Sequence, residues 1–70
     1  MSTINEPKFR AGHIVQHLGR GTEYIIVDTP DNIAIEETNE PGYLYLDPAT
    51  GKKWVRSQTK MEDGRFILLR

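Results

Sequence analysis

The sequence predicts an all-β fold: a small SH3-like barrel of five to six antiparallel strands in a meander. Two observations favour this fold. Short runs of β-branched and aromatic residues alternate with turn residues, and no stretch has the apolar spacing of a helix. The chain has 70 residues, enough for one core but not for two packed sheets of standard size. An OB-fold is the alternative, but it usually needs longer strands and a helix between its third and fourth strands.

The first two predicted strands form a hairpin. The first covers residues 12–18 and ends at the Gly-Arg-Gly of residues 19–21, whose glycines can supply the positive φ of a tight turn. The second, residues 23–28, is almost continuously apolar and is therefore expected at the centre of the sheet. Residues 29–32 fit a type I turn, because a proline presets φ at the second position.

The third and fourth strands follow the same plan. Residues 32–38 alternate apolar and polar side chains, as in a strand that is wet on one face. The Pro-Gly pair within residues 40–43 predicts a type II turn, which leads into the fourth strand at residues 43–46. A turn at residues 47–51 then leads into the fifth strand at residues 52–57.

The last predicted strand, residues 66–69, follows a turn at residues 62–65. The connection at residues 58–61 fits either a short 3₁₀ turn or irregular coil. The strand faces predict a core of Val15, Leu18, Tyr24, Ile26, Ile33, Ile35, Leu44, Leu46, Val55, Phe66 and Leu68.

The sequence predicts a flexible polar N-terminal tail, residues 1–8, followed by a single domain, residues 9–70. The chain has no cysteine, which excludes disulfides, zinc ribbons and thiolate catalysis. No run approaches 18 apolar residues, and no cationic segment precedes an apolar one at the N-terminus. We therefore expect a cytoplasmic protein that is stabilised by packing alone and needs no cofactor.

The formal net charge of −1 conceals a strong separation of charge. Residues 21–50 contain seven acidic residues and no lysine or arginine, whereas residues 1–20 and 51–70 have net charges of +2 and +4. One interpretation is that oppositely charged strands lie side by side and neutralise each other. The alternatives are two faces that attract different partners, or an acidic segment that mimics nucleic acid.

Two motifs that suggest functional sites fail on spacing. His13 and His17 are four residues apart, but on a strand this is roughly 13 Å, too far to share one metal ion, so both are expected on the outer face. Residues 19–21 begin like a dinucleotide fingerprint, but Tyr24 takes the place of its third glycine and no helix follows. Neither serine lies in a nucleophile elbow. We therefore expect no metal site and no enzymatic activity.

The candidate binding residues are basic and aromatic. Tyr43 and Tyr45 occupy alternate positions of one predicted strand, and three further residues occupy alternate positions of the next, so each set shares one face. Such a face can stack bases and hold phosphates. Alternatively, the aromatic residues complete the small core. With the loop arginines included, the candidate set is Arg20, Tyr43, Tyr45, Lys52, Trp54, Arg56 and Arg65.

The motifs of residues 9–15, 19–24, 54–56 and 62–66 resemble those of small phage and prophage proteins. In these proteins a GxxV…GRGTEY hairpin precedes a WVR strand and an EDGRF terminus, and the pattern is similar to short domains of unknown function classed as DUF1653-like. The resemblance covers nearly all of the chain after residue 8. It implies an SH3-like barrel encoded by a mobile element and a non-catalytic accessory role, with no catalytic residues.

We therefore expect a binding module that acts on a host or phage protein. The alternative is a nucleotide or nucleic-acid binder that uses the basic and aromatic face, although the overall acidity of the chain disfavours unaided nucleic-acid binding. No membrane partner is expected. A homodimer that forms through an exposed strand edge is also open.

Overall fold

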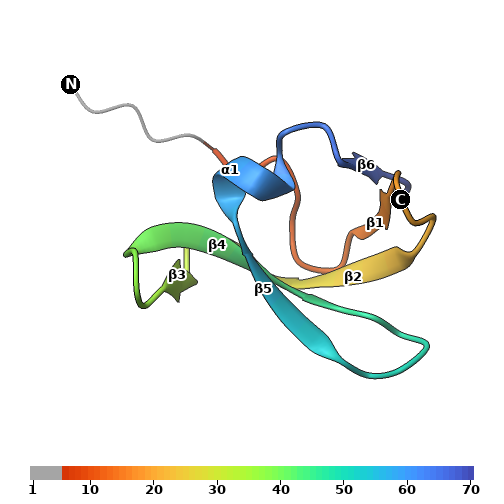
Figure 1. Cartoon of the computed structure of the whole chain (residues 1–70), viewed down its shortest axis with the longest axis horizontal. Coiled ribbons are helices and arrows are strands. Elements are labelled where there is room, and N and C mark those ends of the chain that lie inside the picture. Colours follow the sequence, from red (N-terminus) through yellow and green to blue (C-terminus); the bar gives the residue numbers. More distant parts are fainter. Residues whose placement is uncertain (1–5) are drawn as a thin grey trace.

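The computed structural model describes residues 6–70, which form six strands and one short helix (Figure 1). All strand pairings are antiparallel, which confirms the predicted all-β class. The elements are β1 (Ile14–His17), β2 (Glu23–Asp28), β3 (Ala34–Ile35), β4 (Glu40–Leu46), β5 (Lys53–Ser57), α1 (Gln58–Met61) and β6 (Phe66–Leu68).

β2 and β4 lie at the centre of the sheet. The strand order is β3-β4-β2-β1-β6, and β5 also pairs with β4. The central place predicted for β2 is confirmed, since it pairs with both β1 and β4. β5 is therefore an edge strand, and it leads through α1 to β6 at the other end of the sheet (Figure 1).

The sheet curls like a small barrel but does not close, which departs from the predicted architecture. Closure would require β5 to pair with β6, and the sheet of residues 6–70 has no such pairing. Since β1, β2, β4 and β5 alternate in direction and β6 is antiparallel to β1, β5 and β6 run in the same direction. A parallel pair needs a crossover of about a dozen residues or more. Residues 58–65 alone connect β5 to β6, so direct pairing is out of reach.

Aromatic rings dominate the core. Tyr24 meets Tyr45 edge to face with 5.0 Å between ring centroids, and Phe66 lies 5.8 Å from Tyr45. Such pairs add stability beyond the area that they bury. The Phe66 contact also joins β6 to β4 across the gap that the backbone leaves open. The buried apolar residues are Phe9, Val15, Tyr24, Ile26, Tyr43, Tyr45, Met61 and Phe66.

The predicted core is right for β2 but partly wrong elsewhere. Leu18, Val55 and Leu68 are 54%, 53% and 47% exposed. Leu18 lies in a turn, Val55 lies on the outer face of edge strand β5, and Leu68 is the last residue of edge strand β6. Ile33 and Ile35 are half-buried, as they lie in and beside the short strand β3 rather than in a long third strand. The core therefore depends more on aromatic residues than the strand pattern predicts.

β4 turns the opposite face inward from the one predicted. Tyr43 and Tyr45 are buried, whereas Leu44 and Leu46 are half-buried. The tyrosines can be buried because both hydroxyls find polar partners inside the fold. The type II turn predicted at residues 40–43 is also wrong, since these residues belong to β4 and the chain turns before them, at residues 36–39.

The segment before β1 is fastened to α1 through Glu62. Oε2 of Glu62 accepts hydrogen bonds from the Lys8 backbone N–H at 2.9 Å and from the Tyr43 hydroxyl at 2.5 Å. The same hydroxyl accepts the Phe9 N–H at 3.1 Å. Burial and the bond to Glu62 raise the pKa of Tyr43 well above its ordinary value. The predicted tail thus contacts the domain at Lys8. Residues 1–5 of this tail lie outside the described residues.

The connection at residues 58–61 is one α-helical turn rather than a 3₁₀ turn or coil. Ser57 caps it, since the Ser57 side chain accepts the Lys60 N–H at 3.3 Å. The turn also carries Met61 into the core.

Candidate functional site at the open edge of β5

β5 has one unpaired edge, since it pairs only with β4 among residues 6–70. Just before the strand, the Asp47 N–H donates to the Lys52 carbonyl at 2.9 Å. Hydrogen-bonded and non-hydrogen-bonded pairs alternate along an antiparallel ladder. Trp54 therefore directs its N–H and C=O toward β4, whereas Lys53 and Val55 direct theirs toward the open edge.

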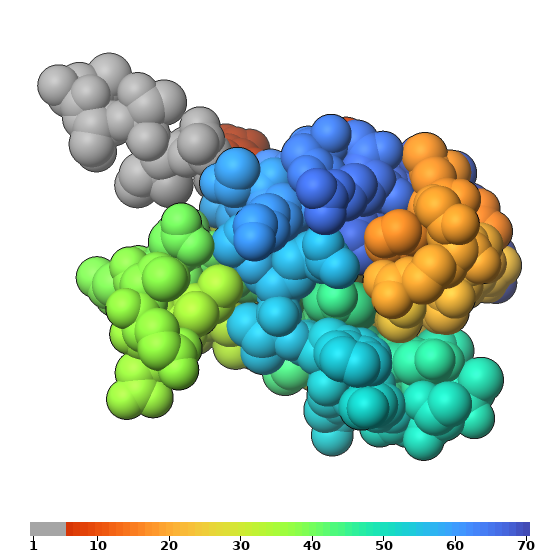
Figure 2. Space-filling view, in the orientation of Figure 1, coloured from red at the N-terminus to blue at the C-terminus, as the bar shows by residue number. Residues whose placement is uncertain are grey.

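A groove of about 450 Å³ lies beside β5. Trp54 and Arg56 line it from the inner face of β5, and Val55 lines it from the outer face. Ile35 and Glu40, from β3 and the start of β4, form a further wall. In Figure 2 the cyan atoms of β5 lie uncovered at the surface, between the green atoms of the β3–β4 region and the orange atoms of the β1–β2 turn.

Trp54 lies in this groove and not in the core. Its register partner is Tyr45, so both rings occupy the inner face, but Tyr45 is buried and Trp54 is 43% exposed. Lys52 Nζ lies 4.6 Å from the centroid of the Trp54 ring, in cation–π contact. The interpretation that the aromatic residues complete the core is thus right for the tyrosines and wrong for Trp54.

Trp54→Ala should leave the protein folded. The ring is nearly half exposed, so its removal should cost the free energy of unfolding about 1–2 kcal/mol, less than the roughly 3–5 kcal/mol of a buried aromatic residue. Urea denaturation followed by circular dichroism measures this. A loss as large as that of a core substitution would contradict the exposed position.

Arg56 joins the groove to the core. Its Nε donates to the Tyr45 hydroxyl at 3.3 Å, and its guanidinium lies 5.2 Å from the centroid of the Phe66 ring. The side chain is therefore held in place while its charge stays at the gap between β5 and β6.

Arg20 and Arg65, the two remaining arginines of the candidate set, do not line the groove. Their charges affect His17, which packs against Phe66. The His17 ring lies edge-on to Phe66 at 4.9 Å, and its Nδ1 accepts the Arg20 backbone N–H at 3.2 Å. Desolvation lowers the pKa of His17, and the positive charges of Arg20, Arg56 and Arg65 lower it further. Because the His17 ring packs against buried Phe66, the prediction that His17 lies on the outer face is wrong.

This lowered pKa makes stability depend on pH. The unfolded chain, with a histidine pKa near 6.5, takes up a proton before the folded chain does. The contribution of His17 to stability is thus complete above pH 6.5 and is lost as the pH falls through the folded-state pKa. NMR titration should give His17 a pKa below 6.5, and Arg20→Gln should raise it. An unchanged pKa in that variant would contradict the electrostatic cause.

The acidic segment does not neutralise the basic residues around β5. Residues 6–70 contain two ion pairs, Arg65–Asp63 at 3.1 Å and Arg70–Glu23 at 3.8 Å. Only the second joins the basic C-terminal region to the acidic middle of the chain. The interpretation of charge neutralisation between strands thus holds at one edge contact and not at β5.

The structure brings together most of the predicted site. Tyr45, Trp54 and Arg56 line the groove, and Lys52 lies against Trp54. Tyr43 is separated from the set, because it is fully buried and its hydroxyl binds Glu62. The sequence interpretation missed Ile35, Glu40, Val55 and Lys60, which also line the groove.

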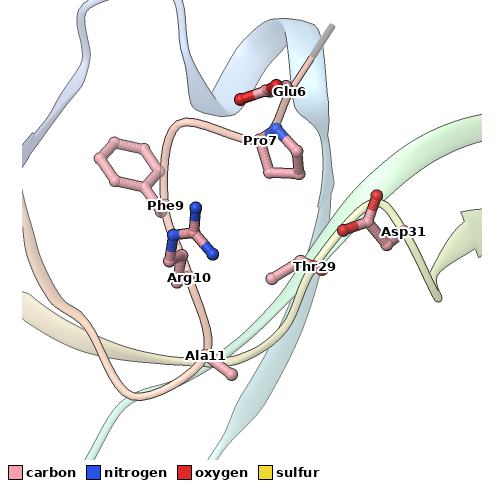
Figure 3. Close-up of a pocket in the computed structure, with 7 residues that line it drawn as sticks. All are labelled: Glu6, Pro7, Phe9, Arg10, Ala11, Thr29 and Asp31. Carbon is pink, nitrogen blue, oxygen red and sulfur yellow. The ribbon is translucent and has the colours of Figure 1, made fainter. Parts of the chain in front are cut away.

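A second hollow, of about 400 Å³, lies beside the segment before β1. Figure 3 shows Arg10 and Asp31 on opposite sides of it, with Glu6 and Pro7 at the rim. Acidic and basic side chains are mixed there, and none of the predicted site residues lines it. We therefore place the candidate site at β5.

Within residues 6–70, no group of three or more histidine and acidic side chains is arranged to hold a metal ion. The one helix in this part of the chain is too short to cross a membrane. Comparison with protein-family models, curated proteins and solved structures finds no match to this chain.

Proposed function

We propose that the chain is a non-catalytic binding module that engages a protein partner through the groove along β5. The open edge of β5 carries this proposal, since unpaired backbone groups lie there beside exposed Trp54 and Val55. The resemblance of the motifs suggests the setting: the partner is a phage or host protein in the cytoplasm.

A protein partner fits this surface better than a nucleic acid does. Val55 is 53% exposed and adds an apolar contact on the face opposite Trp54. Interfaces between proteins are typically built on such apolar and aromatic anchors. Affinity for nucleic acid comes mainly from neutralised phosphates, to which an exposed apolar side chain such as Val55 contributes nothing.

A photo-crosslinking amino acid at position 55 tests the proposal in cells that make the protein. The same group at Val27 is the matched control, because Val27 is also exposed but belongs to β2, which β4 separates from β5. We expect a discrete protein adduct from position 55 and none from position 27, and Trp54→Ala should reduce it. No adduct, or equal adducts from both positions, would contradict a binding role for the β5 groove.

Nucleotide or nucleic-acid binding is the second candidate. It is favoured by the contact between Lys52 and Trp54, and by the positive charges of Arg20, Arg56 and Arg65 that lower the pKa of His17. A ligand at 100 times its Kd stabilises a protein by about 2.7 kcal/mol, so melting temperatures across a panel of nucleotides and short oligonucleotides test it. A stabilising ligand whose effect is lost in Trp54→Ala and Arg20→Ala would support this candidate, and a flat panel would contradict it.

A further inference from the structure

We propose that the partner contributes an extended acidic segment, which adds to the open edge of β5 as a further antiparallel strand. This inference rests on the proposed function and deepens it, because it states the chemistry and the conformation of what is bound.

The backbone of β5 provides the template. Lys53 and Val55, two residues apart, direct N–H and C=O groups toward the open edge, since Trp54 between them pairs with β4. An extended peptide can satisfy all four of these groups with its own backbone, which is how strand addition gains affinity.

The side chains around this edge suit alternate residues of an added strand. On the outer face, Val55 is exposed and lies near Ile35, since both approach Gly42. On the inner face, Trp54 is exposed beside Arg56. The added strand would thus place apolar side chains against Val55 on one face and cover the Trp54 ring on the other.

The charge of the edge selects an acidic strand. Lys53 and Lys60 form no ion pair with any residue in the described part of the chain. Lys52 and Arg56 contact aromatic rings and keep their charge at the surface of the groove. Arg56 and Lys60 line the groove, and Glu40 is the one acidic residue among the residues that line it. Complementary charge of this kind mainly increases the association rate and excludes other sequences.

The same charges disfavour a second copy of the chain as the occupant. Two β5 edges paired with each other would bring Lys52, Lys53 and Arg56 of both copies together. Like charges on neighbouring strands destabilise a sheet, and lysines on edge strands commonly prevent such pairing. The positive charge therefore disfavours pairing between the β5 edges of two copies and favours pairing with a strand of negative charge.

Selection from a random library of ten-residue peptides, with the full chain as target, tests this inference. We expect enriched peptides in which Asp or Glu alternates with Val, Ile or Thr. A synthetic binder should change the fluorescence of the single tryptophan. It should also slow amide exchange at Lys53 and Val55 in the bound chain.

Two kinds of variant probe the mode of binding. Val55→Pro removes an N–H of the open edge without removing a bond to β4, and it should weaken binding at least tenfold. Methylation of alternate backbone nitrogens of the peptide repeats this test without altering the protein: one set of positions should abolish binding and the other should preserve it. Lys60→Glu should weaken binding more at low salt than at high salt, whereas Lys8→Glu, on the segment before β1, should have little effect.

Three results would overturn strand addition: no enriched peptide, enriched peptides without acidic residues, or equal tolerance of both methylation patterns. Dimerisation of the free chain through β5 would also overturn it. If position 55 crosslinks to a protein while the peptide tests fail, the binding module stands and only strand addition is lost. If the crosslink also fails, both proposals are lost.

Discussion

Replacing Phe66 with alanine should unfold much of the protein. The ring is 1% exposed and packs against the rings of Tyr24, Tyr45 and His17, with the guanidinium of Arg56 on its face. Removing a buried phenylalanine costs about 3–5 kcal/mol. A small domain has a total stability near the low end of about 5–15 kcal/mol. Urea denaturation followed by circular dichroism measures the loss.

The neighbouring residue provides the control. Ile67 follows Phe66 in β6 but lies on the opposite face and is 39% exposed. Ile67→Ala should therefore cost only about 1 kcal/mol. Similar losses from the two substitutions would mean that β6 does not turn Phe66 into the core.

Glu62→Ala should give the largest loss among the polar substitutions, about 2–3 kcal/mol. One carboxylate oxygen accepts bonds from the Lys8 N–H, the Tyr43 hydroxyl and the Gln58 amide. Its removal leaves the Tyr43 hydroxyl buried without this acceptor and frees the segment before β1. Chemical denaturation of the variant gives the free energy of unfolding.

A double-mutant cycle with Tyr43→Phe isolates the shared bond. The two substitutions should cost less together than the sum of their separate losses, by about 1 kcal/mol or more. Asp63→Ala is the matched control, since Asp63 is exposed and pairs with Arg65 at the surface, where an ion pair contributes at most about 1 kcal/mol. Additive losses in the cycle would show that Glu62 and Tyr43 act independently.

Elements with strong local signals could be predicted from the sequence. β2 covers the residues predicted for it, because its apolar run is bounded by turn residues on both sides. In the hairpin before it, Gly21 adopts the expected positive φ of 74°. The face of β4 could not be predicted in the same way. The partners that allow Tyr43 to be buried, Phe9 and Glu62, lie 34 and 19 residues away along the chain.

The candidate site was predictable to a similar extent. Strand periodicity places Lys52, Trp54 and Arg56 on one face, and the structure does the same. Whether that face is core or surface depends on whether β6 covers β5, and no local pattern contains that information. The strand pattern places exposed Val55 in the core for the same reason, because an apolar residue on an open edge has the same sequence signature as one inside a closed barrel.

Amide hydrogen exchange along β5 in the free protein tests the central claim, that this edge is open, without any partner. The account predicts slow exchange at Trp54 and Arg56, whose N–H groups bond to β4, and fast exchange at Lys53 and Val55, whose N–H groups face outward. An NMR exchange experiment resolves the four sites separately. Slow exchange at all four would mean that the edge is already covered, by a second copy of the chain or by a closed sheet, and would contradict the proposed site.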